Sequence, residues 1–363
     1  MPPSLRDLPQ LSELLEHPTV QRALERVNQS TIAQQATGFL NELRAGAARA
    51  VEGVPTNVGD LAEAFVRRVL RERGHAEPLV NATGVVLGGV WDGVPLSEAA
   101  VHRVMVLASD YAMVDGAYVR SVEQAAAAAA GCEDALVFSS RAALEACCLA
   151  AGWDNFERAW IAGLVDPETH GLASVPTVAA RLKDRADAVA VSGDGLLGGP
   201  ACAVVFGRSS TLQGVREHEA YAAAAPNRVA LAALEATLGL YQDRETLIHK
   251  LPVWSLLTTP RDNLRQRAER LAPLLAAIPG VAAAEPMEDI SPWCKADGLH
   301  LEASTWCVRV ESGTASVESA AARLERDERV AARQRSDALH LDLRAVFPRW
   351  DQRLVAATES GFG

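Results

Sequence analysis

The chain has 363 residues, 49% of them hydrophobic, and a formal net charge of −11 at pH 7. This length predicts one large domain or two to three smaller ones, with enough apolar residues for a sizeable core. The acidic charge argues against a protein that wraps nucleic acid by overall basicity, although a local basic patch would still be compatible with it.

Two further features restrict the class of protein. No apolar run reaches the length of a membrane span, and the first residues lack the charged-then-apolar pattern of a signal peptide. The six cysteines form no Cys-x-x-Cys pair, and the eight histidines form no i,i+4 pair. We therefore expect a cytoplasmic protein that does not bind membranes, keeps its cysteines reduced in the core and has no metal site.

The first 75 residues are predicted to be helical. A long amphipathic pattern covers residues 19–45, and Asn57 can cap a helix over residues 58–73. The last turns of that helix carry a cluster of arginines, which is most often a solvated helix face. The cluster consists of Arg67, Arg68, Arg71 and Arg73.

Helices and strands are then expected to alternate. Ser97 can cap a helix over residues 98–107, and further elements are predicted at residues 119–130 (helix), 134–138 (strand) and 142–150 (helix). Ser139, Ser140 and Arg141 precede the last of these, where unpaired N–H groups and the helix dipole favour anions. They form a candidate anion site, although an ordinary serine cap is the more common explanation.

A glycine-rich turn follows between two apolar runs, residues 188–191 and 201–206, and each run suits a strand buried on both faces. The turn reads Ser192-Gly193-Asp194-Gly195-Leu196-Leu197-Gly198-Gly199-Pro200. Glycines at this density indicate positive φ angles or a close approach of the backbone to another group. The pattern alone predicts a tight link between strands as readily as a binding site.

This turn resembles the active-site lysine motif of the bacterial L-seryl-tRNA(Sec) selenium transferases, the selenocysteine synthases. In that family the turn reads Ser-Gly-Asp-Lys-Leu-Leu-Gly-Gly-Pro, and its lysine forms the Schiff base with pyridoxal phosphate. Gly195 stands at the lysine position, next to Asp194. Other segments that resemble the family are residues 8–18, 80–87, 95–97, 231–238 and 342–346.

Two other parts of the family's chemistry are missing. The family's polar His, Thr, Asn and Arg side chains after residue 87 are replaced by Gly88, Gly89, Val90 and Gly93. The family aspartate that pairs with the pyridine nitrogen falls near Arg158, in or beside a stretch that this chain lacks. Pyridoxal-phosphate catalysis needs an amine and an acidic partner for the ring nitrogen, so these losses together indicate a pseudoenzyme.

The resemblance implies an α/β fold of the aspartate-aminotransferase type (fold type I). We expect an N-terminal helical domain over residues 1–75, a large domain with a shortened mixed or parallel sheet over 76–250, and a small α/β domain over 251–363. Elements predicted in the small domain are helices over residues 261–278 and 317–326 and strands over residues 305–310 and 338–346. A homodimer or higher homo-oligomer is the expected assembly.

Three functional hypotheses follow. The first is a degenerate relative of selenocysteine synthase that has no catalytic residue and no cofactor. It would act by assembly, by binding tRNA through the arginines at 67–73, or by binding an active family member. Its vestigial cofactor or anion niche would consist of Ser139, Ser140, Arg141, Asp194, Gly198 and Gly199. The second is an active selenium transferase that binds pyridoxal phosphate through a relocated lysine such as Lys183. The third is a protein that binds a small anionic ligand at Ser139, Ser140 and Arg141.

Overall fold

The structure is a computed structural model that describes residues 10–24, 35–41, 58–59, 61–62, 65–66, 78–89, 91, 93–184, 186–313, 316–335 and 337–362. The chain divides into two compact units, Met1–Leu79 together with Gly363, and Val80–Phe362. The boundaries expected at residues 75 and 250 stay predictions. Within the described ranges, no helix is both long and apolar enough to cross a bilayer.

The N-terminal unit contains α1 (Leu11–Glu16) and α2 (Pro18–Leu24), and Pro18 begins α2 as its sequence position predicts. Its described residues form a small core of their own, in which the rings of Phe39 and Phe65 lie 5.5 Å apart. Most of the helices predicted over residues 19–45 and 58–73 lie outside the described residues. The same holds for Arg67, Arg68, Arg71 and Arg73.

A four-stranded mixed sheet forms the first half of the larger unit. Its order is β3-β6-β5-β4, with β6 antiparallel to both neighbours and β4 parallel to β5. The strands are β3 (Asp134–Phe138), β6 (Ala203–Gly207), β5 (Ala188–Ser192) and β4 (Glu157–Arg158). The strands predicted at 134–138 and 188–191 are confirmed, and the third begins two residues later than the apolar run that predicted it.

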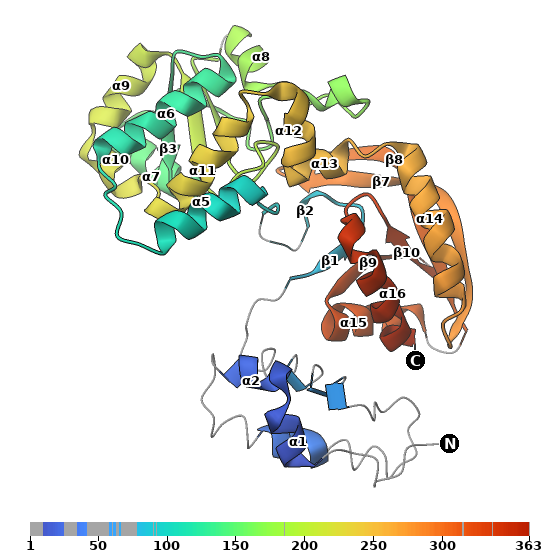
Figure 1. The fold of residues 1–363 in the computed structure, drawn as a ribbon. Helices are drawn as coiled ribbons and strands as arrows, with labels where there is room; N and C mark the ends of the chain where they lie inside the picture. The colour runs from blue at the N-terminus through green and yellow to red at the C-terminus, as the bar shows by residue number, and fades with distance from the viewer. Residues whose placement is uncertain are drawn as a thin grey trace. The chain divides into compact units, whose positions relative to one another are not determined.

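Both faces of this sheet are covered by helices, as Figure 1 shows. Alternate residues of β5 explain the layering, because Val189 and Val191 join one core cluster while Ala188 and Ala190 join another. The helices of this half are α5 (Glu98–Ala108), α6 (Gly116–Ala130), α7 (Arg141–Ala150), α8 (Val178–Lys183), α9 (Ser209–Glu217), α10 (Glu219–Ala224), α11 (Arg228–Leu240), α12 (Arg244–Lys250) and α13 (Pro252–Leu257), with the 3-10 turn η1 (Pro167–His170).

Local capping explains where two of these helices begin. Ser97 accepts a hydrogen bond from the backbone N–H of Ala100, which confirms the predicted cap of α5. Helix α6 begins at Gly116, three residues earlier than predicted, because Asp115 caps it by accepting from Tyr118 N.

A six-stranded sheet forms the second half, in the order β1-β9-β10-β8-β7-β2. Two short strands from early in the chain sit at its edges and pair in parallel, β1 with β9 and β2 with β7. The strands are β1 (Val80–Ala82), β9 (Val330–Arg335), β10 (Ala338–Asp342), β8 (Leu299–Ser312), β7 (Val281–Ala296) and β2 (Leu87–Gly88). Helices α14 (Arg261–Ala276), α15 (Val317–Glu328) and α16 (Asp351–Phe362) pack with the sheet into one core, and η2 (Pro348–Trp350) precedes α16.

Two strand predictions need correction. The strand predicted over residues 338–346 ends at Asp342, where the carboxylate accepts a hydrogen bond from Arg344 N and the chain turns. Strand β7 was not predicted, and it makes a long hairpin with β8 that extends the predicted strand at both ends. The hairpin turn uses Asp297 (φ 50°) and Gly298 (φ 79°), a left-handed pair that is typical of tight hairpins.

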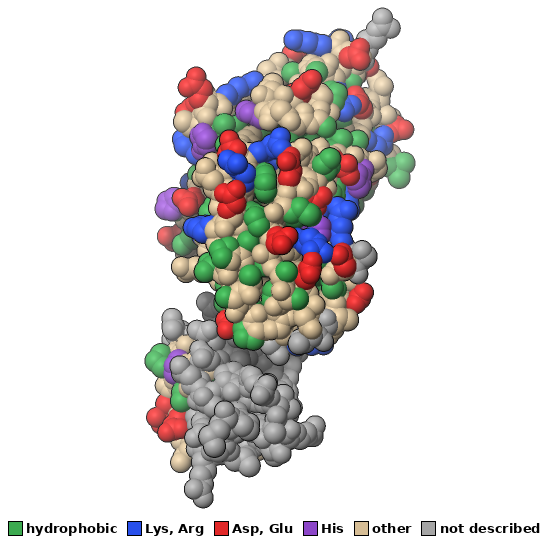
Figure 2. All heavy atoms as spheres, turned by 90° about the vertical axis from the view of Figure 1, so that its right-hand side faces the viewer, with side chains coloured by type: hydrophobic (Ala, Val, Ile, Leu, Met, Phe, Trp, Pro, Cys, Tyr) green, Lys and Arg blue, Asp and Glu red, His purple; other side chains and the backbone are tan. Residues whose placement is uncertain are grey.

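One face of the larger unit carries charges of both signs (Figure 2). On the face shown in Figure 2, acidic and basic side chains lie interspersed over the described part of the chain. This arrangement agrees with the overall acidic charge and shows no broad basic surface on that face.

Candidate functional site

The turn between β5 and β6 is held by its own backbone. Gly193 N donates to Cys202 O at 2.8 Å, Gly199 N donates to Gly193 O at 2.7 Å, and Gly198 N donates to Gly195 O at 3.0 Å. Two of these glycines are required by geometry. Gly198 has φ +72°, and a β-carbon on Gly193 would lie 2.4 Å from Pro200 O.

Side chains from the core secure the same turn. The buried Trp254 donates from its indole Nε1 to Leu196 O at 3.0 Å, and the buried Tyr241 hydroxyl donates to Leu197 O at 3.0 Å. Leu196 and Leu197 are themselves fully buried. The turn therefore keeps its shape through packing and hydrogen bonds that involve no ligand.

Gly195 occupies a closely packed position in this turn. A β-carbon there would lie 3.1 Å from Trp160 O and 3.4 Å from Ser192 O, so a side chain would need its neighbours to shift by a few tenths of an ångström. The backbone φ of Gly195 lies outside the left-handed region. Close packing therefore favours glycine at position 195, whereas its backbone conformation is open to other residues as well.

Polar side chains from three elements meet beside the turn. Ser192 donates to Asp194, and Arg141 at the start of α7 donates from Nε to Ser192 Oγ at 3.4 Å. Arg141 also forms an ion pair of 2.7 Å with Asp297, at the tip of the β7–β8 hairpin. The Arg141 guanidinium lies over the Trp160 ring, 4.8 Å from its centroid.

The structure thus brings together Arg141 and Asp194, two of the six residues predicted for a cofactor or anion niche. Asp297 and Trp160 complete the cluster, and the sequence did not predict either of them. Asp297 lies at a hairpin tip and Trp160 in a loop, and neither segment has a sequence pattern that predicts its contact with Arg141. A glycine could have pointed to the cluster. Gly93 has φ +77°, and a β-carbon there would lie 3.2 Å from Asp194 Cβ.

The other predicted niche residues have structural partners. Ser140 caps α7 by accepting from Ala143 N at 3.0 Å, and Ser139 N donates to Ala224 O. Gly198 and Gly199 face the core, where β-carbons would meet Val253 Cγ1 and Thr237 Cγ2. These contacts are those of an ordinary helix cap and a packed turn.

The residues at the turn do not fit pyridoxal phosphate as the family motif would hold it. A Schiff base requires an amine, and Gly195 has no side chain. The Arg141 guanidinium is engaged by Asp297 and Trp160, and the Ser140 hydroxyl is engaged by the helix cap. The buried Cys202 beside the turn is no substitute nucleophile, because burial raises its pKa to about 12.

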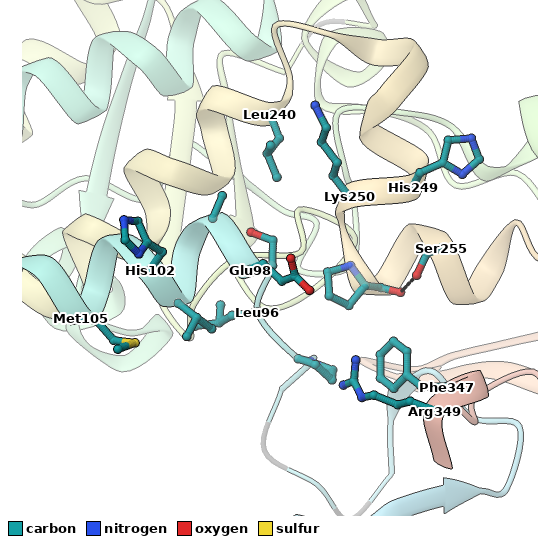
Figure 3. A pocket seen from close by; sticks show the side chains of 15 residues that line it. Leu96, Glu98, His102, Met105, Leu240, His249, Lys250, Ser255, Phe347 and Arg349 are labelled. Atoms are coloured by element: carbon teal, nitrogen blue, oxygen red, sulfur yellow. Dashed lines mark hydrogen bonds between the residues drawn. The ribbon is translucent and has the colours of Figure 1, made fainter. Parts of the chain in front are cut away.

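A separate groove of about 750 Å³ lies between α5, the α12–α13 corner and η2. Figure 3 shows Glu98 and Leu96 near the start of α5, Lys250 and His249 at the end of α12, and Phe347 and Arg349 near η2. The Arg349 guanidinium stacks over the Phe347 ring at 4.4 Å. Residues of the glycine turn do not line this groove, so the two features are distinct.

Sequence comparisons match this chain to the family that the glycine turn resembles. The sequence model of the L-seryl-tRNA selenium transferases matches residues 157–347. An L-seryl-tRNA(Sec) selenium transferase of Moorella thermoacetica is 31% identical over 198 residues, which is 53% of this chain and 42% of that protein. One from Klebsiella pneumoniae is 41% identical over 114 residues, 31% of this chain and 25% of that protein. The matched regions span less than half the length of these relatives.

A solved structure confirms the predicted fold class. D-glucosaminate-6-phosphate ammonia-lyase superposes with a TM-score of 0.50 at 15% identity, over 81% of this chain and 97% of that one. Histidinol-phosphate aminotransferase from Sinorhizobium meliloti, in complex with pyridoxal-5'-phosphate, gives a TM-score of 0.42 at 12% identity, over 81% and 93% of the two chains. The match to the ammonia-lyase shows the fold, and the chain has the predicted aspartate-aminotransferase-like fold of fold type I.

Proposed function

We propose that this chain, which belongs to the L-seryl-tRNA selenium transferase family, has lost that family's lysine chemistry and acts by assembly. The observation that carries the proposal is Gly195, which stands where the family turn has its lysine. The turn around it is intact and is held by backbone and core contacts. A turn that folds without the amine can take part in binding but cannot form a Schiff base.

The positions of the lysines support the loss of chemistry. Lys183 ends α8 just before β5 begins, whereas the turn follows the other end of that strand, roughly 13 Å away at about 3.3 Å per residue. Lys250 lines the separate groove. Lys295 lies on β7, two residues before the Asp297 that pairs with Arg141. If any amine served as a replacement, Lys295 would be better placed than Lys183.

The alternative of an active selenium transferase is tested by single-turnover conversion of seryl-tRNA, with excess protein and added pyridoxal phosphate. We expect no conversion by the wild-type chain. Conversion that disappears in Lys295→Ala and persists in Lys183→Ala and Lys250→Ala would overturn the proposal and identify the relocated amine.

An exposed apolar surface on α5 supports assembly. Ala100 is the one residue of this eleven-residue helix that is buried, while Val101, Met105 and Val106 are exposed. The connection to α6 continues the surface with Tyr111 and Met113, whose side chains are almost wholly exposed. Large apolar side chains exposed close together along the chain support a contact site for another protein.

We infer that the partner is a second copy of this chain. The groove beside α5 carries Lys250 and Arg349, and the protruding connection carries acidic Asp110 and Asp115 around its apolar residues. Helix α5 thus lies between an exposed acidic connection and a groove with two cations, Lys250 and Arg349, and one carboxylate, Glu98. A two-fold dimer requires a self-complementary surface.

Solution mass measurements by light scattering test this assembly. We expect the wild-type chain to be a dimer at micromolar concentration, and Met105→Glu or Tyr111→Asp to shift it toward the monomer. Leu149→Glu is the matched control, because Leu149 is 85% exposed on α7, away from this surface. A monomeric wild type, or equal effects from the control, would contradict the proposed dimer.

Binding of tRNA is a second expected interaction, suggested by the substrate in the relatives' names and by Arg67, Arg68, Arg71 and Arg73. Filter binding against tRNA at increasing salt tests it. Each phosphate contact adds about 0.7–0.9 to the slope of log affinity against log salt, so charge reversal at Arg67 and Arg71 should flatten that slope. Binding that is absent, or unchanged in this variant, would remove the arginine cluster as an RNA site.

A further inference from the structure

The six-stranded sheet has a polar face on the side away from its helices. Along β8 and β10, Val308 and Leu341 enter the core shared with α14 and α16, so the alternate residues Cys307 and His340 point to the opposite face. Strand β7 adds Asp289 to this face, in register with Thr305. Three strands thus each place one side chain that can ligate a metal at a single location.

The donor atoms of these residues converge on one point. His340 Nδ1 lies 3.1 Å from Asp289 Oδ2 and 3.8 Å from Cys307 Sγ, and all three atoms lie within 4.8 Å of one another. Ligands around tetrahedral zinc, at about 2.0–2.3 Å from the ion, are roughly 3.3–3.6 Å apart. The two distances from His340 Nδ1, 3.1 and 3.8 Å, lie just below and just above this range.

The same geometry excludes a nucleophilic triad. In such a triad the two ring nitrogens of the histidine serve two different partners, whereas here one nitrogen, Nδ1, faces both the thiol and the carboxylate. One proton on Nδ1 can only be shared between the two partners, at 3.1 Å from the carboxylate oxygen and 3.8 Å from the sulfur. A cation at the point of convergence would satisfy all three groups at once.

We propose that Asp289, Cys307 and His340 form a binding site for a divalent transition-metal ion, with zinc as the best match. Thiolate, imidazole and carboxylate are the three ligand types that zinc uses in proteins. Cys307 and His340 are buried and Asp289 is nearly so, so the ligands are held in place before the ion arrives. The site is independent of the proposed loss of lysine chemistry.

Neighbouring side chains fix the orientation of the ligands. Arg333 donates to Asp289 Oδ2 at 2.8 Å, and Ile290 N and Arg335 donate to Oδ1 at 2.8 and 3.3 Å. A carboxylate can accept about four bonds, so one position on Oδ2, the one that faces His340, is left for an ion. Outer contacts of this kind orient the ligands of metal sites. The arginines also oppose a bound cation, so the affinity should be lower than that of a site without them.

Asp342 lies beside the three ligands but belongs to the scaffold. Its carboxylate accepts from Ser291 Oγ at 2.6 Å, Thr305 Oγ1 at 2.9 Å and Arg344 N at 2.9 Å. These bonds occupy both oxygens, and Asp342 is completely buried. The proposed site therefore has three protein ligands.

The prediction of no metal site relied on spacing along the chain. A site built from three neighbouring strands that pair antiparallel produces no short repeat of His and Cys. The pairing of β7, which the sequence did not reveal, is what places Asp289 in reach. The proposal therefore replaces that prediction.

Cobalt(II) titration of the full-length protein, kept reduced and first stripped with chelator, tests the site. We expect one equivalent to bind, with a near-ultraviolet thiolate-to-cobalt band that zinc displaces. Cys307→Ser should remove the band, and Asp289→Asn should weaken binding by at least tenfold. Cys294→Ser is the matched control, because Cys294 is an equally buried cysteine of the same sheet.

Three results would overturn the proposal. These are the absence of a stoichiometric cobalt complex in the wild-type protein, a complex without the thiolate band, and a band that survives Cys307→Ser or disappears in Cys294→Ser. If Cys307→Ser fails to fold, the wild-type melting temperature decides instead. Zinc should raise it and magnesium should not, and Asp289→Asn, in which the ligand is partly exposed, should lose the rise.

Discussion

The glycine turn after β5 and the polar face of the six-stranded sheet both lie next to buried strands, yet they are stabilised in different ways. The turn uses backbone hydrogen bonds and carbonyl contacts to Tyr241 and Trp254. The polar face uses bonds between side chains, centred on Asp289 and Asp342. A backbone-built turn can keep its shape when its functional side chain is replaced, whereas a cluster of side chains depends on every member.

The comparison predicts the largest effect at Gly84, which packs against the polar face. A β-carbon there would lie 2.4 Å from Asp342 Oδ2 and 2.6 Å from Ser291 Oγ, and the residue has φ +83°. Gly84→Ala should cost about 3–5 kcal/mol in the free energy of unfolding, because it displaces a buried, bonded carboxylate. Chemical denaturation measures this. Gly131→Ala is the control, since Gly131 has φ +67° but open space, and it should cost only about 1 kcal/mol.

A smaller effect is expected where a core side chain supports the turn. Trp254→Phe removes the indole donor to Leu196 O and leaves that buried carbonyl with one fewer partner. Denaturation should show a loss of about 2 kcal/mol. Tyr241→Phe should cost about 1 kcal/mol, because the turn retains its backbone bonds. A loss as large as that of Gly84→Ala would mean that the turn also depends on single side chains.

The pH dependence of stability tests a side-chain network that joins β3 of the four-stranded sheet to α6 and α9. Burial of Asp134 acts to raise its pKa, but hydrogen bonds from Arg216 and Arg120 outweigh burial and lower it. The stabilisation is therefore complete above the unfolded pKa of about 3.9 and is lost as the pH falls through the lower folded value. Melting temperature should drop by a few degrees through this window, and Asp134→Asn should flatten that drop. If the melting temperature fell equally with pH in the wild-type protein and in Asp134→Asn, Asp134 would not be the group responsible.

The smallest effect is expected at the exposed edge of the turn. Arg141 and Asp297 form an ion pair in which both side chains are about one-third exposed. Arg141→Gln should change the free energy of unfolding by less than about 1 kcal/mol. A larger loss in denaturation would show that this cluster supports the fold and is not only a remnant of a binding site.

The same contrast explains what could be predicted from the sequence. Apolar runs predicted β3 and β5, and the turn motif, which is local in sequence, predicted the family and the fold class. Strand β7 was missed because, after Val281, it reads Ala-Ala-Ala-Glu-Pro, residues with little strand preference. It forms because β8 pairs with it and α14 packs against it.

The candidate sites were predicted only where they are local. Arg141 and Asp194 could be identified because each belongs to a recognisable segment, a helix start or the turn. Asp297 could not, because its contact with Arg141 depends on the unpredicted hairpin. The Asp289, Cys307 and His340 group escaped for the same reason, since sheet pairing and not spacing brings its members together.

The central claim is that this chain has no amine that can form a Schiff base with pyridoxal phosphate. The direct measurement is the absorbance spectrum after incubation with pyridoxal phosphate and dialysis, followed by borohydride reduction and peptide mapping, beside Gly195→Lys as the variant that restores an amine at the turn. We predict that the wild-type protein stays colourless and that no lysine is stoichiometrically modified. One equivalent of cofactor trapped on Lys183, Lys250 or Lys295 of the wild-type chain would contradict the account.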